Sequence, residues 1–506
     1  MLEALFERYQ RPILLAETSH VGSGRGAWIK DVSSEVAQAV LNGVDMQGIC
    51  LYPIIDRPDW ENSTLWHHSG LWDVTEEHQH AFTRTLSQPY AAALRHAQAF
   101  LREFTHSDER RCITESKAMS EKKCIVFSHL RWDFVFQRPQ HVLSRLASHY
   151  QIIFIEEPVF EPGDAGLHFS SPAPNVTVVR PHTPQTQAGF HDEQLSMLKP
   201  LMAQLCGKDE SPVVWFYTPM ALPLLTHFAP SAVVYDCMDE LALFENAPRQ
   251  LLQRESALLK RADVVFTGGP SLYASKKPRH PNVHCFPSSV DAIHFEQALD
   301  RTNDHPLQEH LPHPRLGYYG VIDERMDLPL VAALADAHPE WQIMMVGPVV
   351  KIDPLTLPVR PNIHYFGQRP YQALPQFLAG WDVCLMPFVL NDSTKFISPT
   401  KVLEYMAAEL PIVSTAIADV VAPYGDIVFI GQNTAEFIHY CEQSVALNEQ
   451  VKTVMAKKMR KIIRQTSWED TVRKMSSLIQ SSVFKKELLK QSLLALEHEK
   501  QQSTRL

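Results

Sequence analysis

The sequence lacks the features that mark membrane and secreted proteins. No uninterrupted apolar run approaches the roughly 20 residues that a membrane-spanning helix needs. The start, MLEALFERYQ, shows no basic segment followed by a long apolar core, so we expect no signal peptide. The eight cysteines are scattered and form no CxxC pair, which is typical of buried free thiols in a reducing cytosol. The sequence therefore predicts a cytoplasmic protein that contacts a membrane, if at all, from the inner face.

The sequence also lacks a surplus of positive charge. Its formal net charge is −10, which argues against a nucleic-acid-binding surface over the whole molecule. With 45% hydrophobic and 21% charged residues, the composition is that of an ordinary globular protein. The length of 506 residues is enough for about two to four domains, each with a core of its own.

Short apolar strands alternate with helical stretches in two successive blocks. The strands that we expect in the first block are KCIVFS, QIIFIE, VTVVR, VVWFY, AVVYD, DVVFTG and VHCFP. Those of the second block are RLGYYG, WQIMMVG, NIHYFG, DVCLMPF, LPIVST and DIVFIG. Such alternation indicates parallel sheets with helices on both faces. We therefore predict an α/β fold with two Rossmann-like doubly wound domains, at 122–295 and 315–432, and a cleft between them. The polar stretch 296–314 is expected to connect them.

The two ends of the chain differ from these blocks. Residues 1–105 predict strand, helix, strand, a loop rich in Trp and His, and a helix near 79–104. The polar stretch 106–121 has no periodicity and indicates a linker. Residues 433–506 are expected to be helical, and between 451 and 490 they carry 8 Lys and 3 Arg against 3 acids. This basic helical region predicts either a packed helix with a solvated face or peripheral contact with anionic lipid.

The most informative motif is SPTKVLEYMAAELPIVST, at 398–415. Ser398 is a good N-cap before Pro399, and Lys401 then lies in the first turn, where a cation is disfavoured unless an anion is near. Free backbone amides at that end would bind phosphate, and Glu404 could accept two hydrogen bonds from a ribose diol. The opposite face is the apolar stripe of Val402, Leu403, Met406 and Leu410, while Ala408 leaves space beside Glu404. Spacing alone equally allows an exposed Lys–Glu pair on a surface helix.

Residues 122–480 resemble a family of known enzymes. The motifs that carry the resemblance are WDFVFQRPQHVLSRLA, VVYDCMDE, LLKRADVVFTGGPSLY, VDAIHF and SPTKVLEYMAAELPIVST, in that order. They are similar to retaining glycosyltransferases with two Rossmann domains (the GT-B type), in the large family four group, and most of all to bacterial enzymes of surface-polysaccharide synthesis. The resemblance implies transfer of a sugar from a nucleotide-sugar co-substrate to a glycan or lipid-linked acceptor, with no further cofactor.

The resemblance implies a donor site on the second domain. Glu404 would hold the nucleotide ribose, and Gly320 in GYYGVID would mark the close-packed loop near the pyrophosphate. The donor residues that we assign are Gly320, Ser398, Thr400, Lys401 and Glu404. The family's cationic pair for the pyrophosphate is not obvious here, so Arg325 and Lys401 are assigned to it and act with Glu404 in catalysis. No Asp-x-Asp sequence occurs in the chain, so we expect no metal, and cations with helix amides would stabilise the departing phosphate.

The acceptor side is expected on the first domain. The loop HLRWDFVFQRPQH follows that domain's first strand, where a side chain of a doubly wound domain faces the cleft. The acceptor-side residues that we assign are His129, Arg138, Gln140, His141, Asp236 and Asp239.

Several family positions differ in this chain. A second Glu often stands eight residues before the ribose-binding one, and that position is Phe396 here. An Asn-Gly pair is replaced by Ser288-Ser289, and a common His by Met238 and Asp239. These differences motivate an alternative, a catalytically silent glycosyltransferase-like scaffold in a polysaccharide assembly.

Glu17 raises a separate question at the start of the chain. Residues 11–75 resemble the end of a β-glucosidase-type glycoside hydrolase barrel, because PILLAET is similar to the strand that carries the nucleophilic Glu. A retaining glycosidase needs a second carboxylate about 5 Å away, and the strand that would carry it is absent. We therefore interpret 1–105 as a partial barrel fragment and Glu17 as vestigial; a glycosidase acting at Glu17 is the third hypothesis. The nearby WHHSGLWD, with His78 and His80, matches no usual zinc spacing, so no metal is expected there either.

Overall fold

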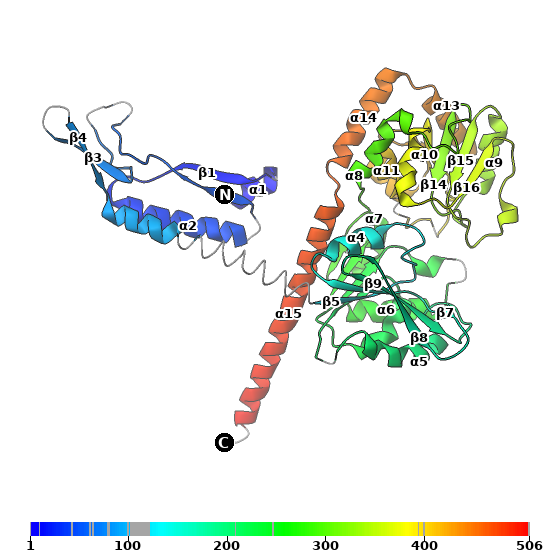
Figure 1. Cartoon of the computed structure of the whole chain (residues 1–506), viewed down its shortest axis with the longest axis horizontal. Helices are drawn as coiled ribbons and strands as arrows, with labels where there is room; N and C mark the ends of the chain where they lie inside the picture. The colour runs from blue at the N-terminus through cyan, green and yellow to red at the C-terminus, as the bar shows by residue number, and fades with distance from the viewer. Residues whose placement is uncertain are drawn as a thin grey trace. The chain divides into compact units, whose positions relative to one another are not determined.

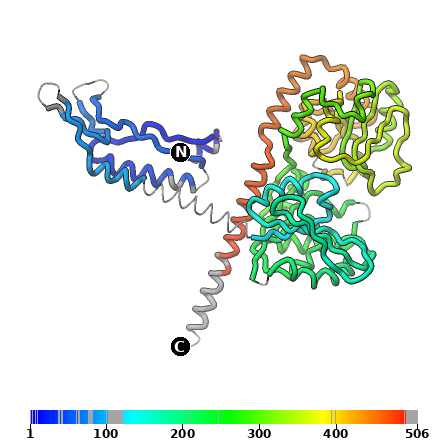
Figure 2. Tube along the Cα trace, in the orientation of Figure 1, coloured from blue at the N-terminus to red at the C-terminus, as the bar shows by residue number. Residues whose placement is uncertain are grey.

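The computed structural model describes residues 2–9, 11–41, 44–59, 62, 65–77, 81–98, 101, 122–207, 209–244, 247–392, 394–397 and 400–503. The chain divides into two compact units, Met1–Ala118 and Met119–Leu506, and each is described by itself (Figures 1 and 2). The predicted linker at 106–121 lies outside the described residues, as do His78, His80 and Ser398.

The first unit is built on a strand–helix–strand segment. Strand β1 (Ile13–Thr18) pairs in parallel with β2 (Met46–Leu51), and helix α2 (Arg25–Leu41) makes the crossover between them. The other elements are α1 (Leu2–Tyr9), η1 (Gly22–Gly24), β3 (Trp72–Glu77), β4 (Ala81–Leu86) and a helix at 88–98. A small apolar core joins Ile29 of α2 to Tyr90, Ala93 and Ala97 of the last helix.

The expected helix at 79–104 is wrong at its start. Residues 81–86 form strand β4, which pairs antiparallel with β3 from Trp72 opposite Leu86 to Glu77 opposite Ala81. The physical reason is the composition of AFTRTL, in which a phenylalanine and two β-branched threonines favour a strand. The helix begins only at residue 88, with Pro89 in its first turn, where proline is tolerated. A barrel origin for this unit remains a prediction.

The second unit begins with a doubly wound domain. Its strands are β5 (Lys123–Phe127), β6 (Gln151–Ile155), β7 (Val159–Phe160), β8 (Gly166–Ala173), β9 (Val176–Thr183), β10 (Val213–Phe216), β11 (Ala232–Cys237), β12 (Val264–Thr267) and β13 (Val283–Cys285). The order in the sheet is β13-β12-β11-β10-β5-β6-β9-β7, with β8 antiparallel beside β9 and every other pairing parallel. All seven expected strands are present. Strands β7 and β8 were not predicted, because β8 is mostly exposed and shows no apolar run.

Helices cover both faces of this sheet. They are α4 (Arg138–Leu146), α5 (Asp192–Leu201), α6 (Gln250–Arg261) and α7 (Pro270–Lys276), with 3-10 turns η2 (Met202–Gln204), η3 (Pro219–His227), η4 (Leu241–Leu243) and η5 (Lys277–Arg279). Alternate residues of a strand point to opposite faces, and both sets are buried. Ile125 and Phe127 of β5 belong to one apolar cluster, while Cys124 and Val126 belong to another on the other face.

The second domain repeats the plan with a shorter sheet. Its strands are β14 (Arg315–Tyr319), β15 (Gln342–Val346), β16 (Ile363–Gly367), β17 (Val383–Met386), β18 (Ile412–Thr415) and β19 (Phe429–Gly431). They lie in the order β16-β15-β14-β17-β18-β19, all parallel, and match the six expected strands. The helices and 3-10 turns are α8 (Ala292–Phe295), η6 (Glu296–Leu299), η7 (Arg301–Asn303), α9 (Leu328–Ala337), η8 (Pro354–Thr356), η9 (Tyr371–Ala373), α10 (Leu374–Ala379), α11 (Lys401–Ala407), α12 (Ala418–Tyr424) and α13 (Thr434–Val445).

The chain passes between the two domains at two places. Phe286 packs on the core of the first domain and Val290 lies in the core of the second, so the first crossing is at 286–290. The stretch 296–314 then lies on the second domain, where η6 packs against α10. The second crossing joins α14 (Glu449–Ile463), which packs on α11, to α15 (Trp468–Ser503), which packs on α4, β11 and β12. Within the described part of the chain, no helix has both the length and the apolar character that a membrane span requires.

Trp468 anchors α15 on the first domain. Its indole is 1% exposed and stacks on the His141 ring, with centroids 4.7 Å apart. We expect Trp468→Ala to lower the free energy of unfolding by about 3 to 5 kcal/mol, because a large buried side chain is lost. Thermal unfolding measures the effect. The control is Phe484→Ala on the same helix, where the ring is 61% exposed, and equal losses in the two variants would contradict the prediction.

Candidate active site

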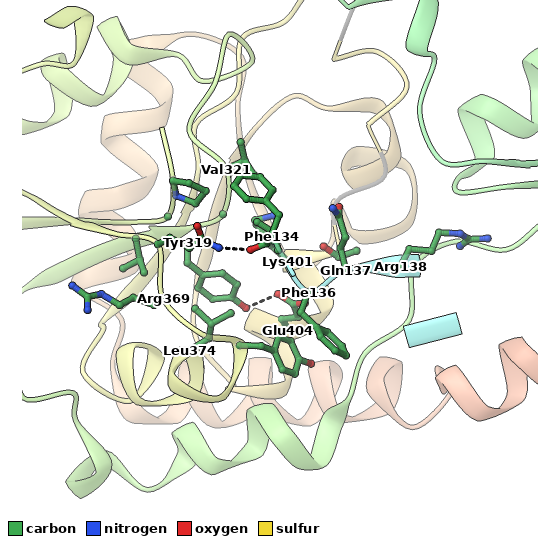
Figure 3. A pocket seen from close by; sticks show the side chains of 18 of the residues that line it. Phe134, Phe136, Gln137, Arg138, Tyr319, Val321, Arg369, Leu374, Lys401 and Glu404 are labelled. Carbon is green, nitrogen blue, oxygen red and sulfur yellow. Dashed lines mark hydrogen bonds between the residues drawn. The ribbon is translucent and has the colours of Figure 1, made fainter. Parts of the chain in front are cut away.

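A cavity of about 550 Å³ lies between the two doubly wound domains (Figure 3). Its walls come from residues that follow strand ends: Gly268 follows β12, Gly320 follows β14 and Gly347 follows β15. In both sheets the order of the strands reverses here, beside β5 in one and beside β14 in the other. Doubly wound sheets bind ligands at the carboxyl ends of the strands, at such switch points. The volume is in the range of small-molecule sites.

Glu404 lies on the second-domain wall of this cavity. Helix α11 buries Val402, Leu403, Tyr405 and Met406, and leaves Lys401 and Glu404 to line the cavity. The helix is therefore not a surface helix with an exposed Lys–Glu pair. The Tyr319 hydroxyl donates a 2.6 Å hydrogen bond to Glu404 Oε2 (Figure 3). Burial raises the pKa of Glu404, while the charge of Lys401 and the Tyr319 hydrogen bond lower it, and the net direction is upward.

Two corrections concern the same helix. Ala408 does not face open space, because it is buried in the core of the second domain. The helix begins at Lys401 with Thr400 at the N-cap, and Thr400 makes no capping side-chain hydrogen bond although it lines the cavity. The helix is only seven residues long, so its amides alone do not identify an anion site.

Lys401 is held close to the backbone of Gly320. Gly320 has φ +139°, and a Cβ there would lie 2.2 Å from Lys401 Cε, so only glycine fits at this position. The Lys401 ammonium makes no hydrogen bond or ion pair with another described residue, and lies 5.8 Å from the centroid of the Tyr318 ring. Burial lowers the pKa of Lys401, and the charge of Arg325 lowers it further, while Glu404 raises it. The ammonium is thus a half-buried cation without a direct anionic partner among the described residues.

Arg325 is the second cation at the cavity. Its Nε and Nη2 donate to the Asp323 carboxylate, at 2.7 to 3.0 Å. Burial lowers the pKa of Arg325, but Asp323 and Asp239 more than offset this and raise it overall. Its Nη1 makes no hydrogen bond to any described residue. Arg325 and Lys401 are thus near enough to repel one another, and an anion bound between them would relieve that repulsion.

The first-domain wall contains a buried ion pair. Arg138 donates from Nε and Nη2 to Asp236, at 2.9 to 3.2 Å, and from Nη1 to the carbonyl of Phe286. Arg138 lines the cavity, but these bonds direct its guanidinium toward Asp236. Asp239 also lines the cavity, and burial raises its pKa, although Arg325 and Lys351 lower it in part.

Four residues assigned to the acceptor side do not line the cavity, and one of them, Asp236, is the buried partner of Arg138. Gln140 donates to the carbonyls of Trp132 and Val135, so it supports the loop from beneath. His141 packs on Trp468, and burial first, then Arg145 and His294, lowers its pKa to about 3. His129 has a buried Nδ1 with no hydrogen-bond partner among the described residues, and burial lowers its pKa to about 4. Gln140 and His141 belong to helix α4 and not to the loop, and the sequence did not show which way these side chains point.

The loop instead presents aromatic residues that were not assigned. Phe134 and Phe136 line the cavity, and the Phe136 ring lies 4.6 Å from that of Tyr371 in the second domain. The Gln368 side chain donates to the Phe134 carbonyl, so the loop contacts the second domain twice. The signal in the sequence was WDFVFQ, where aromatic residues follow the end of a strand.

The substituted family positions lie around the same cavity. Met238 and Ser288 line it, while Ser289 is buried. Phe396, in place of the second Glu, packs against the apolar core of the first domain. It therefore contributes an apolar contact between domains where a Glu would contribute charge.

Two groups of side chains in the described residues could hold a metal ion, and neither lines the cavity. Glu161, His168 and His182 lie together on the exposed part of the first-domain sheet. Asp56, His68 and Asp73 lie in the first unit. The second group is part of an ion-pair network, in which Arg25 bonds Asp73 at 2.9 Å and His68 lies 3.1 Å from Asp56.

Glu17 is the last residue but one of β1, and its side chain is exposed. Its φ of +54° is unusual for a residue other than glycine. It forms no hydrogen bond or ion pair with the other described residues. The interpretation of Glu17 as vestigial stays a prediction.

Two doubly wound domains around one cavity define the class of fold: a two-domain α/β fold of the GT-B type. Residues 314–446 match the family model described as Glycosyl transferases group 1. TuaH of Bacillus subtilis (strain 168), described as a teichuronic acid biosynthesis glycosyltransferase, is 23% identical over 279 residues. These are 51% of this chain and 70% of TuaH.

Solved structures share the fold at low sequence identity. Sucrose-phosphate synthase from Thermosynechococcus elongatus has a TM-score of 0.51 and 15% identity, over 74% of this chain and 100% of its own. HepE of Anabaena, in complex with UDP and glucose, has a TM-score of 0.50 and 14% identity, over 71% of this chain and 100% of its own. The catalytic domain of Starch Synthase IV from Arabidopsis thaliana, bound to ADP and acarbose, has a TM-score of 0.51 and 10% identity, over 72% of this chain and 99% of its own. This chain is a glycosyltransferase.

The buried pair of Arg138 and Asp236 generates a prediction for stability. Arg138→Ala would leave the Asp236 carboxylate buried and without its cation, so we expect a loss of about 3 to 5 kcal/mol in the free energy of unfolding. Denaturant unfolding measures it. Arg473→Ala is the control, because its pair with Asp470 is exposed and should contribute little. A loss no greater than in this control would show that the buried pair does not stabilise the domain.

Glu17 generates a prediction for activity. We expect no hydrolysis of aryl β-glycosides by the full chain, because the interpretation of Glu17 as vestigial leaves it without the second carboxylate that a retaining glycosidase needs. The measurement is release of the aryl group by the wild type and by Glu17→Gln. Turnover that disappears in the variant would place a hydrolase activity in the first unit.

Proposed function

We propose that this chain transfers a sugar from a nucleoside diphosphate sugar to a glycan or lipid-linked acceptor during synthesis of a cell-surface polysaccharide. The reaction proceeds with retention at the anomeric carbon and without a metal ion. The observation that carries the proposal is the meeting of Lys401, Arg325 and Glu404 on one wall of an interdomain cavity.

Each of these three groups has a role that follows from its chemistry. The Lys401 ammonium and the free Nη1 of Arg325 bind the diphosphate of the donor. They also stabilise the charge that develops on it when the bond to the sugar breaks. The carboxylate of Glu404 accepts hydrogen bonds from the ribose hydroxyls. At Gly320, the missing side chain lets the diphosphate approach the backbone.

The polysaccharide context rests on similarity. TuaH is described by its part in teichuronic acid biosynthesis, and its matched region spans most of its length. Both UDP and ADP are bound by structural neighbours, so the proposal leaves the base and the sugar of the donor open.

We also propose that the protein acts in the cytoplasm and contacts the inner face of the membrane through α14. Ala456, Met459 and Ile463 of this helix are buried, while Lys457, Lys458, Arg460 and Lys461 are exposed. Such a basic outer face suits anionic headgroups, which would bring the enzyme to a lipid-linked acceptor.

The silent scaffold remains the second candidate, because Met238 at the cavity and Phe396 between the domains stand where family members have polar residues. A panel of nucleoside diphosphate sugars separates the two. A transferase hydrolyses or transfers at least one donor above the Glu404→Gln background, whereas a scaffold shows neither. Unchanged turnover in excess EDTA tests independence from metal in the same assay.

Glu404→Gln tests the donor site directly. We expect it to weaken binding of the preferred nucleoside diphosphate about tenfold, or about 1.4 kcal/mol, because a neutral amide accepts the ribose hydrogen bonds less strongly. The melting temperature of the free protein should change little, since Glu404 lines a cavity. Ligand-induced thermal shifts with UDP, ADP and GDP measure both quantities.

Glu296→Gln is the matched control, because this glutamate is exposed on the same domain and makes no described hydrogen bond. Equal thermal shifts in wild type, Glu404→Gln and Glu296→Gln would remove Glu404 from the donor site.

A further inference from the structure

Tyr319 is the last residue of β14, the strand at the switch point of the second sheet. It is 3% exposed, yet its ring reaches the cavity wall. Its hydroxyl is the described hydrogen-bond donor to Glu404, at 2.6 Å from Oε2 (Figure 3). Sequence analysis did not single it out, since a tyrosine in the strand RLGYYG predicts a core residue.

The position of the Tyr319 ring is determined from several sides. Its backbone N–H donates to the Tyr405 hydroxyl at 3.3 Å, and the Tyr405 ring packs edge-on at 5.1 Å. The Phe295 ring lies parallel to it at 6.2 Å, and the Trp381 ring lies 6.0 Å away. Burial raises the pKa of Tyr319 well above its ordinary value, so the hydroxyl keeps its proton. A rigid donor is thus directed at one carboxylate oxygen.

The other oxygen of Glu404 is left for a ligand. Oε1 makes no hydrogen bond to a described residue, and Glu404 itself lines the cavity. A carboxylate that is free to rotate would lose conformational entropy on binding a diol, whereas a fixed one has already lost it. Resting on the proposed function, we propose that Tyr319 is a positioning residue: its hydroxyl fixes Glu404 so that Oε1 accepts the ribose hydroxyls of the donor.

The same hydrogen bond affects the charge of Glu404. The ionisable groups that face it, within the described residues, are Lys401 and Tyr405 on its own helix, Tyr319 on β14 and Tyr371 on η9. Burial raises the pKa of Glu404, and only Lys401 and Tyr319 lower it. Removing the Tyr319 hydroxyl therefore raises this pKa further. The carboxylate then becomes protonated at a higher pH, and donor binding is lost at a higher pH as well.

Tyr319→Phe is the test, because it removes the hydroxyl and keeps the ring. We expect KM for the donor to rise about fivefold to tenfold while kcat changes less than twofold, as the bond positions a binding group. The acid limb of kcat/KM should move to higher pH, since this limb reports ionisations of the free enzyme. A merely structural role would lower the melting temperature without moving that limb.

Tyr365→Phe is the matched control. The Tyr365 hydroxyl donates to the Pro358 carbonyl in the same domain and away from the cavity. The Tyr365→Phe variant should have the same KM for the donor and the same pH profile as the wild type. The full chain is used throughout, and the binding affinity for UDP and ADP is measured beside turnover.

The outcomes separate this inference from the proposed function. If Glu404→Gln loses donor affinity but Tyr319→Phe matches wild type in KM and in its acid limb, the positioning role is overturned and the function stands. If the wild type binds neither nucleotide and turns over no donor, the proposed function fails, and this inference with it. The positioning role is supported if Tyr319→Phe has a higher KM and an acid limb at higher pH, while the controls Tyr365→Phe and Glu296→Gln match the wild type in both.

Discussion

The structure of the second unit depends on one constraint, the parallel pairing of its strands. A parallel strand must be followed by a crossover to return the chain, so the carboxyl ends of all strands in a sheet lie along one edge. In each of the two sheets the order of strands reverses once, at β5 and at β14. The reversal leaves a crevice, and the two crevices face the same cavity. Residues far apart in sequence, from Trp132 to Glu404, line one cavity for this reason.

Charge in the cavity is divided between paired and unpaired groups. Arg138 is neutralised by Asp236, and Arg325 is partly neutralised by Asp323. Lys401 lies near Arg325 without a hydrogen-bonded anion, and its lowered pKa reflects burial and that repulsion. A buried cation is costly unless it is paired. The second wall is therefore complementary to an anion such as a diphosphate, while Glu404 beside it is complementary to hydroxyl groups.

How much could be predicted from the sequence differs between backbone and side chains. The expected strands of both domains are present, because a strand buried on both faces is a continuous apolar run, as in VVWFY. Lys401 and Glu404 could be assigned because helical periodicity separates them from the buried stripe. The acceptor-side roles of Gln140 and His141 were not correct, since both lie near the start of α4 and sequence does not show which neighbours such residues contact. Tyr319 was missed because its hydrogen-bond partner, Glu404, is 85 positions away in the sequence.

The second crossing between domains has a mechanical consequence. Helix α14 belongs to the second domain and α15 to the first, and only residues 464–467 separate them. With the crossing at 286–290, the two bodies are joined at two points. From two such connections we expect sliding and twisting of the domains to be restrained, and rotation about the line through both connections to be the easiest relative motion. The cavity would then open and close by a single hinge rotation of one domain relative to the other.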